Sequence, residues 1–244
     1  MIYNNRMNKK ITIGITGAGG ALGKSLTKKF KSGGYKIIGF SHSQFSNSLG
    51  ESDPDEWVKW ECGKEYLLED ALKKIDILIL NHGVYQSGIS NANYQNSIEI
   101  NALSKFRLLS MFEEIALSNK EDQKKEIWIN TSEAEILPAI NPSYEISKLL
   151  IGQIITFKKN FLTKTQKKNF TIRKIILGPF KSKLNPIGIM TPDLVATLIF
   201  LLTKVNSYLI IISPNPLSYI VFPIKEFYFL IYCKFLSVFK IIKT

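Results

Sequence analysis

Short apolar runs alternate along the chain with longer stretches of helical periodicity, and this alternation restricts the fold more than any other feature. The runs are continuous, as in IDILIL at 75–80, which suits parallel strands that are covered on both faces. The predicted strands are 11–16, 35–40, 57–60, 75–80, 126–130, 171–177 and 208–212. Helical stretches at 22–30, 95–117 and 143–161, and one with Thr191 as N-cap and Pro192 at its first position, lie between them. The pattern predicts an α/β fold: a doubly wound parallel sheet of about seven strands with helices on both faces.

The 244 residues, 45% of them hydrophobic, suffice for one such domain with a full core. We divide the chain into a polar tail at 1–10, the α/β domain at 11–214 and an apolar segment at 215–244. The net charge of +12 comes mainly from dispersed lysines, so we expect no nucleic-acid partner. Cys62 and Cys233 lie far apart without a C-x-x-C motif, which predicts neither a disulfide framework nor a metal site. The polar start does not resemble a secretory signal, so we expect a cytoplasmic protein.

A glycine-rich turn, TGAGGALG, joins the first predicted strand to the first predicted helix. At such a turn, backbone N–H groups at the helix N-terminus can bind a dinucleotide pyrophosphate, and glycines allow its close approach. For a glycine run taken alone, a tight turn without a ligand is the alternative. The candidate cofactor-binding residues are Thr16, Gly17, Gly19, Gly20, Ala21, Leu22 and Gly23.

The end of the second predicted strand bears on which cofactor binds. An acidic residue there would hold the ribose 2′-hydroxyl of NAD, but the chain has Ser41, His42 and Ser43. These side chains could bind a 2′-phosphate. We therefore favour NADP(H), with NAD(H) as the other possibility and a solvated polar turn as the alternative without a ligand.

Tyr144 and Lys148 are four residues apart on a predicted helix, so they share one face. A lysine ammonium near a phenol favours the phenolate and lowers its pKa from about 10, which suits a general acid and base. Ser132 follows the fifth predicted strand and could orient a substrate oxygen, with Thr131 as the fallback hydroxyl. Because the chain is rich in tyrosine and lysine, a Tyr-x-x-x-Lys pair could occur by chance. The prediction therefore rests on the order of these residues after the glycine turn.

The segments in this order resemble those of the short-chain dehydrogenase/reductase family. The turn at Thr16–Gly23 is similar to the family pattern T-G-x-x-x-G-x-G, with Ala21 at the position of the middle glycine. Asn81, His82 and Gly83 resemble the N-A-G motif, and PSYEISK resembles the catalytic Tyr-x-x-x-Lys segment. The resemblance implies an NAD(P)-binding Rossmann domain and an oxidoreductase that interconverts a carbonyl and an alcohol of a small-molecule substrate.

The resemblance also implies roles for individual residues. It would place Asn81, His82 and Gly83 beside the adenine ribose. It would put Asn101 in a locally distorted helix, completing a catalytic set with Ser132, Tyr144 and Lys148. LGPFKS after the sixth predicted strand resembles P-G-x-x-x-T, which would place Gly178 and Ser182 at the cofactor.

The apolar C-terminal segment is interrupted by Lys225, Glu226 and Lys234, so no charge-free run reaches the ~18 residues of a membrane-spanning helix. Wound as a helix after Pro223, it places its aromatic and aliphatic residues opposite these charges. The residues predicted on the apolar side are Phe227, Tyr228, Ile231, Tyr232, Phe235, Val238, Phe239 and Ile242. We expect this side to pack against the core or a second subunit, which makes a homo-oligomer the expected state. Peripheral membrane contact is the alternative, and a lipophilic substrate would agree with it.

Two other functions stay open at this point. The protein could be a catalytically silent dinucleotide-binding redox sensor, or a peripheral membrane protein carried on this fold. The set of Ser132, Tyr144 and Lys148 favours an enzyme. Glu133 and Glu135, which are unusual beside a hydride-transfer site, could bind a polyhydroxylated substrate.

Overall fold

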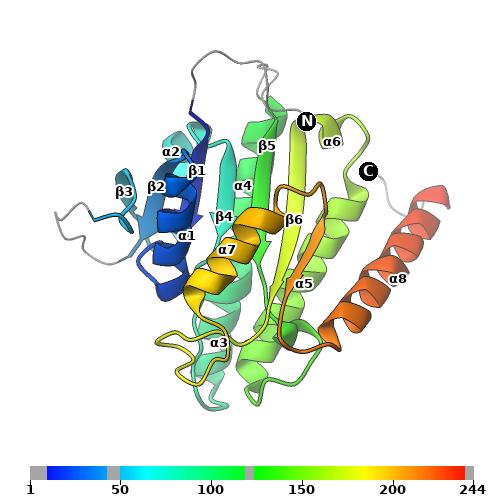
Figure 1. Cartoon of the computed structure of the whole chain (residues 1–244). Coiled ribbons are helices and arrows are strands. Elements are labelled where there is room, and N and C mark those ends of the chain that lie inside the picture. The colour runs from blue at the N-terminus through cyan, green and yellow to red at the C-terminus, as the bar shows by residue number, and fades with distance from the viewer. Residues whose placement is uncertain (1–9, 43–49, 119–123, 240–244) are drawn as a thin grey trace.

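The computed structural model describes residues 10–42, 50–118 and 124–239, which form a three-layered α/β domain (Figure 1). All strand pairs are parallel, in the order β3-β2-β1-β4-β5-β6-β7. The doubly wound sheet predicted from the sequence is confirmed. The strands are β1 Thr12–Thr16, β2 Lys36–Ser41, β3 Glu56–Lys59, β4 Ile77–Leu80, β5 Lys125–Asn130, β6 Phe170–Leu177 and β7 Leu209–Ile212. Most of the polar tail predicted at 1–10 lies outside the described residues.

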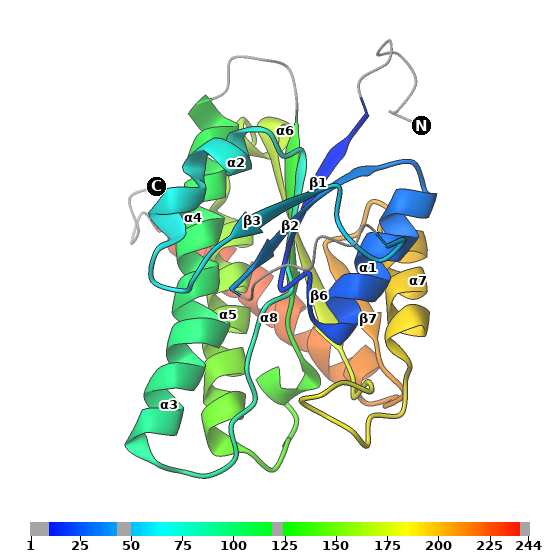
Figure 2. The same cartoon turned by 90° about the vertical axis from the view of Figure 1, so that its left-hand side faces the viewer.

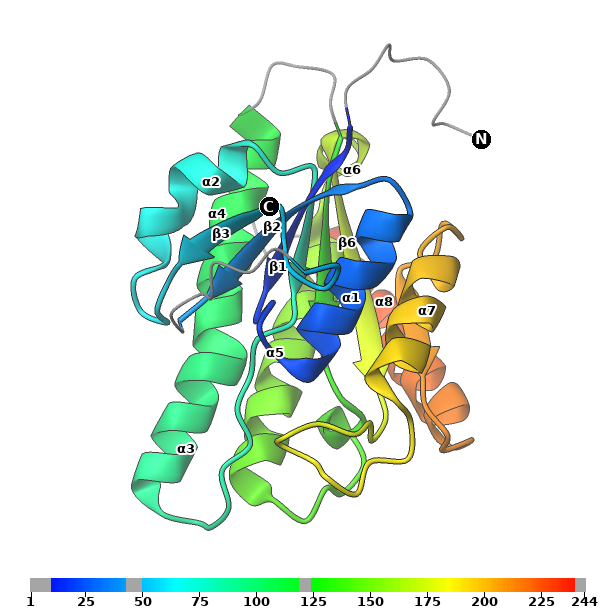
Figure 3. The ribbon, with the colours of Figure 1, turned by 60° about the vertical axis from the view of Figure 1, so that its left-hand side comes forward.

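Helices cover both faces of the sheet, as Figure 2 shows in side view. One face carries α1 Ala21–Ser32 and α7 Pro192–Leu202, which lie side by side (Figure 3). The other carries α2, α4 and α5. The remaining bounds are η1 Glu65–Leu68, α2 Glu69–Lys73, α3 Asn91–Ile98, η2 Glu99–Leu103, α4 Ser104–Ser118, η3 Glu133–Glu135, α5 Pro142–Phe161, α6 Gln166–Asn169 and α8 Ser218–Val238.

Burial on both faces explains why the strands are continuously apolar. In β4, Ile77 and Ile79 belong to the core under α1 and α7, whereas Leu78 and Leu80 belong to the core under α4 and α5. Successive side chains of a strand point to opposite faces, so a strand between two cores needs apolar residues at every position.

The structure confirms some helix boundaries and corrects others. Thr191 caps α7 as predicted, with its Oγ1 accepting a hydrogen bond from the Leu194 N–H at 3.2 Å. The helical stretch predicted at 95–117 lies within α3, η2 and α4, which follow one another without a break and include a π-helical turn at Glu99–Leu103. The predicted start after Pro223 is wrong, since α8 begins at Ser218. Buried contacts of Ser218 and Phe222 hold that first turn against the body.

A buried ion-pair network joins α8 to the sheet. Lys174 of β6 is fully buried, and its ammonium donates to Glu226 at 2.8 Å, to the Gly152 carbonyl at 3.0 Å and also to Glu135. Lys225 donates to Glu135 at 2.7 Å. These bonds connect β6, η3, α5 and α8 through charged groups away from water.

The prediction that the apolar side of α8 packs against the core is wrong, whereas its packing against a second subunit stays a prediction. Lys225 and Glu226 point into the body, and the apolar side is exposed rather than packed against the core. The physical reason is the charge on Lys174, which requires carboxylate partners in the interior. Ile242, also predicted on the apolar side, lies outside the described residues.

Substitution of two glycines in the glycine-rich turn between β1 and α1 tests how closely the helix approaches the strand. A Cβ on Gly23 would lie 2.2 Å from the Gly17 carbonyl oxygen, whereas a Cβ on Gly19 would find its nearest neighbour, Ser41 Oγ, at 3.6 Å. We expect Gly23→Ala to lower the free energy of unfolding by roughly 1–3 kcal/mol because the backbone must move apart. Gly19→Ala should stay within about 0.5 kcal/mol of the wild type. Urea denaturation measures both, and equal stabilities would contradict the assignment.

Candidate active site

The glycine turn presents backbone N–H groups at an accessible helix N-terminus. Gly17 has φ +66°, and a Cβ there would lie 3.0 Å from the His82 Cα. Gly19, Gly20 and Ala21 are exposed, and α1 begins without a side-chain cap or an acidic residue in its first turn. The first N–H groups of a helix have no partner within it, so this turn fits an anionic group such as a dinucleotide pyrophosphate. Leu22 is buried in the core, so it can contribute only its backbone.

The end of β2 lies beside this turn. The Ser41 hydroxyl is 3.6 Å from the position of a Cβ on Gly19. His42 is exposed, as is Lys24 in the first turn of α1, while Ser43 lies outside the described residues. Ser41 and His42 thus lie at the strand end beside the glycine turn, and their contact with the adenosine ribose stays a prediction.

Thr16 and Asn81 hold the ends of the central strands together. Thr16 Oγ1 accepts a hydrogen bond from the Asn81 N–H at 2.9 Å and lies 2.8 Å from His82 Nδ1. Asn81 Oδ1 accepts from the Asn130 amide at 3.0 Å. These bonds fix the carboxyl ends of β1, β4 and β5 relative to one another.

Two buried basic groups lie close behind the loop that follows β4. His82 is buried, and burial together with the nearby ammonium groups of Lys105 and Lys148 holds its pKa well below the ordinary 6.5. Lys105 donates to the Asn130 carbonyl at 2.8 Å, and burial and Lys148 lower its pKa well below 10.5. Sequence reasoning missed Lys105. A signal was present, because it lies at helical spacing from Asn101 and Leu108 on the buried side.

Asn101 connects the loop after β4 to α5. Its Oδ1 accepts from the Val84 N–H at 2.8 Å, and its amide donates to the Val84 carbonyl and to Ser147 Oγ, both at 3.0 Å. A Cβ on Gly83 would lie 2.9 Å from Asn101 Oδ1, so this position excludes larger residues. The helix is π-helical at Asn101, which confirms the local distortion expected from the family resemblance.

Tyr144 and Lys148 share one face of α5, as predicted. Asn141 caps the helix by accepting from the Tyr144 N–H at 3.1 Å, which fixes the first turn. Lys148 Nζ lies 5.2 Å from the centre of the Tyr144 ring and 3.8 Å from a Cβ position on Gly83. The ring of Tyr85 lies against Tyr144, at 5.2 Å between ring centres. The arrangement brings a phenol, an ammonium and the Gly83 loop together.

Ser132 lies at the carboxyl end of β5 and remains the candidate hydroxyl. Its Oγ is partly exposed and accepts from the Ala134 N–H at 3.2 Å. Thr131, the fallback hydroxyl, is buried, and its N–H donates to the Ile175 carbonyl at 2.8 Å. Its backbone therefore continues the pairing of β5 with β6. No hydrogen bond joins Ser132 to Tyr144, and the role of each stays a prediction.

Other predicted residues of this end have bonds within the fold. Glu133 accepts from Ser213 and Ser218, and Glu135 belongs to the buried network around Lys174. Glu135 is buried in this network, which contradicts the prediction that it binds a polyhydroxylated substrate, whereas Glu133 is partly exposed and its contact with such a substrate stays a prediction.

Gly178 and Ser182 lie on the segment that follows β6. A Cβ on Gly178 would lie 2.7 Å from Ser213 Oγ, so a larger residue would push apart the segments after β6 and β7. Ser182 Oγ accepts from the Asn185 N–H at 3.1 Å and closes the loop turn. Their predicted contacts with a cofactor stay predictions.

The chain is similar in sequence to a known enzyme family and in fold to solved structures. Residues 13–154 match the model of the NAD dependent epimerase/dehydratase family. The chain is 40% identical over 225 residues to monoglucosyldiacylglycerol epimerase from Synechocystis sp.. That alignment covers 90% of this chain and 53% of the relative, so the chain spans about half the length of that protein.

Solved structures share the fold at low sequence identity. A short-chain dehydrogenase from Burkholderia cenocepacia in complex with NADP has a TM-score of 0.70 at 13% identity, covering 84% of this chain and 88% of that one. A short-chain dehydrogenase/reductase from Brucella melitensis has a TM-score of 0.67 at 18% identity, covering 84% and 96%. These matches confirm the Rossmann-like architecture.

The buried neutral imidazole of His82 predicts a pH dependence of stability. Since its pKa is lowered in the folded state, the unfolded chain binds the extra proton below about pH 6.5, and stability falls as the pH decreases. One proton gives a slope of about 1.4 kcal/mol per pH unit. We expect His82→Asn to lose this component in urea denaturation between pH 7.5 and 5. His42→Asn, at an exposed position, is the control, and equal slopes in wild type and His82→Asn would contradict the prediction.

Proposed function

Because the chain belongs to the NAD-dependent epimerase/dehydratase family of short-chain dehydrogenase/reductase-like enzymes, we propose that it oxidises and re-reduces a hydroxyl-bearing carbon with Tyr144 as acid and base. The substrate proposal rests on the 40% identity to a monoglucosyldiacylglycerol epimerase. We propose a glycolipid whose sugar hydroxyl is epimerised. Net oxidation or reduction of a carbonyl/alcohol pair is the second candidate, favoured by the shared fold of the solved dehydrogenases.

The residues that would hold the cofactor fit a dinucleotide. The exposed turn at Gly19 and Gly20 and the uncapped start of α1 would bind the pyrophosphate, and Ser41 and His42 would face the ribose. The absence of a carboxylate at Ser41 and His42 supports NADP(H) over NAD(H). When bound, the nicotinamide would supply the acceptor and donor of hydride.

Proton transfer falls to the residues of α5 and the loop after β5. The phenolate of Tyr144 would take the proton of the substrate hydroxyl, and the phenol so formed would return it to the carbonyl oxygen. Lys148 Nζ lies 5.2 Å from the centre of the Tyr144 ring, so a positive charge stands beside the group that would exchange the proton. Ser132 would hold the substrate oxygen, and the bonds of Asn101 to Val84 and Ser147 keep the loop after β4 against α5.

The test uses monoglucosyldiacylglycerol in detergent with NADP⁺ far below the substrate concentration. An epimerase needs only catalytic cofactor, so we expect many sugar turnovers per NADP⁺ and no steady rise of reduced-nicotinamide absorbance. Sugar analysis by chromatography measures the product. Absorbance that rises in proportion to product would favour the dehydrogenase, and cofactor binding without turnover on a broad carbonyl and alcohol panel would favour the redox sensor.

Tyr144→Phe tests the proton-transfer role within this assay. Loss of the phenol should lower kcat by roughly 10²–10⁴-fold while the Kd for NADPH stays within about threefold of the wild type. Tyr66→Phe, which removes an exposed hydroxyl on η1, is the matched control. Full activity in Tyr144→Phe would show that another group carries the proton.

Ser41→Asp tests the cofactor preference. A carboxylate beside Gly19 would repel a 2′-phosphate and accept a hydrogen bond from a 2′-hydroxyl. We expect the ratio of NADPH to NADH affinity, measured by fluorescence titration, to fall by at least about tenfold. Ser41→Asn, which has the same shape without the charge, is the control. A wild type that binds NADH more tightly than NADPH would refute the preference.

A further inference from the structure

Helix α8 turns its charged residues inward and its apolar residues outward. Of its charged residues, Lys225 and Glu226 face the body, with side chains 14% and 10% exposed. Glu226 accepts from Lys174 and Thr156, both at 2.8 Å. Only Lys234 among the charged residues of α8 is exposed. A helix that packed on a core through its apolar side would show the opposite arrangement.

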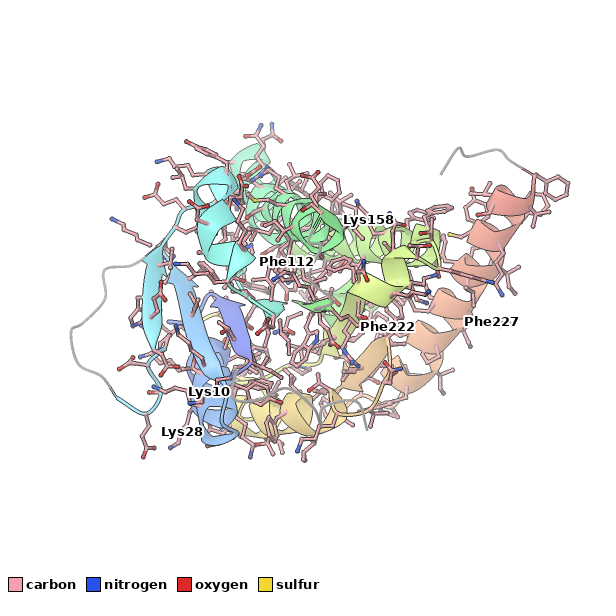
Figure 4. All side chains as sticks on the ribbon, turned by 90° about the horizontal axis from the view of Figure 1, so that it is seen from above. Lys10, Lys28, Phe112, Lys158, Phe222 and Phe227 are labelled. Carbon is pink, nitrogen blue, oxygen red and sulfur yellow. The ribbon has the colours of Figure 1, made fainter. Side chains whose placement is uncertain are left out.

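The outward side of α8 is a large apolar surface that no part of the described chain covers. Only Ser218, Phe222 and Cys233 of the helix are buried. Figure 4 shows Phe222 on the side of α8 toward the body and Phe227 on the side away from it. The large exposed residues, each 41% to 75% exposed, are Tyr219, Ile220, Ile224, Phe227, Tyr228, Ile231, Tyr232, Phe235, Val238 and Phe239. A continuous exposed apolar surface of this kind marks contact with a membrane or another protein.

A basic groove lies beside the distal half of this surface, between the ends of α5 and α8. It has a volume of about 380 Å³ and contains three lysines, Lys159, Lys167 and Lys234, next to apolar Leu230 and Val238. Burial lowers the pKa of Lys159, which lies over the Tyr208 ring at 4.2 Å.

The lining of this groove suits an anion. Both polar atoms of the Asn160 amide are buried without a partner among the described residues. The described lining holds no carboxylate that would neutralise the lysines. The groove therefore has the charge and the free hydrogen-bonding capacity to receive an anionic group.

Two further apolar side chains are exposed on loops at the carboxyl edge of the sheet. Ile140 and Ile187 are 97% and 90% exposed on loops at the carboxyl edge of the sheet, where α8 also begins (Figure 1). The loop 181–189 is held in place, with the Lys181 N–H donating to the Met190 carbonyl at 2.8 Å and the Ile189 N–H to the Pro179 carbonyl at 3.0 Å. The isoleucines are thus presented outward by an ordered backbone.

We propose that the outward side of α8 binds the surface of a lipid bilayer, with the groove between α5 and α8 receiving the phosphate of an anionic lipid. Three features favour lipid over a second copy of the chain. The apolar residues lie beside lysines, which anionic lipids attract. Tyr219, Tyr228 and Tyr232 combine an apolar ring with a polar hydroxyl, as residues at membrane interfaces do. Two copies with a formal net charge of +12 each repel one another, whereas an anionic bilayer attracts the lysines of the groove.

The mode of binding is peripheral. In the part of the chain that the structure describes, no helix is long and apolar enough to cross a membrane. An amphipathic helix can instead lie in the interface with its apolar side among the acyl chains. Binding depends on α8 and the groove beside it, so its test needs neither cofactor nor glycolipid.

The experiment is flotation of the full chain with vesicles of phosphatidylcholine, with or without 30% phosphatidylglycerol. We expect binding to the anionic vesicles that weakens at high salt. Phe227→Ser with Ile231→Ser removes two exposed side chains and should lower the partition coefficient at least about tenfold. Tyr66→Ser with Leu67→Ser, exposed on η1, is the matched control and should bind as the wild type does.

A charge series tests the groove. Lys167→Gln with Lys234→Gln should weaken binding to anionic vesicles by roughly 30-fold, since each lysine near the surface contributes about fivefold. Lys10→Gln with Lys28→Gln removes the same charge from the far side of the molecule, as Figure 4 shows, and should have a much smaller effect. Equal effects of the two pairs of substitutions would overturn the assignment of the groove as the phosphate-binding site.

Other outcomes distinguish a membrane-binding surface on α8 from a dimer interface, and this proposal from the proposed catalytic function. A concentration-dependent dimer that Phe227→Ser with Ile231→Ser dissociates, without vesicle binding, would assign α8 to a second copy and overturn the proposal. Vesicle binding by Tyr144→Phe equal to that of the wild type is expected, because the surface does not depend on catalysis. Vesicle binding without any epimerase activity would sink the proposed function and leave this surface standing.

Discussion

The buried ammonium of Lys174 sets the arrangement of the catalytic end of this protein. It lies in β6 with no exposure to water, and an ion in that position must have partners of opposite charge. Its partners are Glu135 of η3 and Glu226 of α8, together with the Gly152 carbonyl of α5. The segment that begins at Ser132 and the C-terminal helix are therefore positioned by the same charge.

The orientation of α8 follows from this charge. Turning Lys225 and Glu226 to solvent would take a carboxylate away from Lys174 and an ammonium away from Glu135, so these two buried groups would keep only each other as ion-pair partners. The inward position of Lys225 and Glu226 keeps the additional ion pairs and leaves the apolar residues facing outward. Burying one such side chain contributes about 1.5–3 kcal/mol, so a helix with this exposed side is stabilised by whatever apolar phase covers it.

The sequence predicts the sheet well because the signal is local. A strand between two cores is apolar at every position, and all seven predicted strands are present in the described chain within about two residues at each end. The faces of α8 could not be predicted, because helical periodicity shows which residues share a side but not which side meets the body. That choice depends on Lys174, which the sequence alone does not show to be buried beside α8.

In the candidate site too, some features follow from local sequence and others appear only in the folded structure. Spacing along one helix brings Tyr144 and Lys148 together, whereas the contacts of Asn101 with Val84 and Ser147 join three separate segments and required the fold. Lys105 shows the cost of this arrangement. Its ammonium is buried near that of Lys148 and donates to the Asn130 carbonyl rather than to a carboxylate, and both burial and repulsion lower its pKa. Positive charge at Lys105 and Lys148 favours an anionic ligand nearby, because the charge of a bound dinucleotide would offset the repulsion between the two ammonium groups.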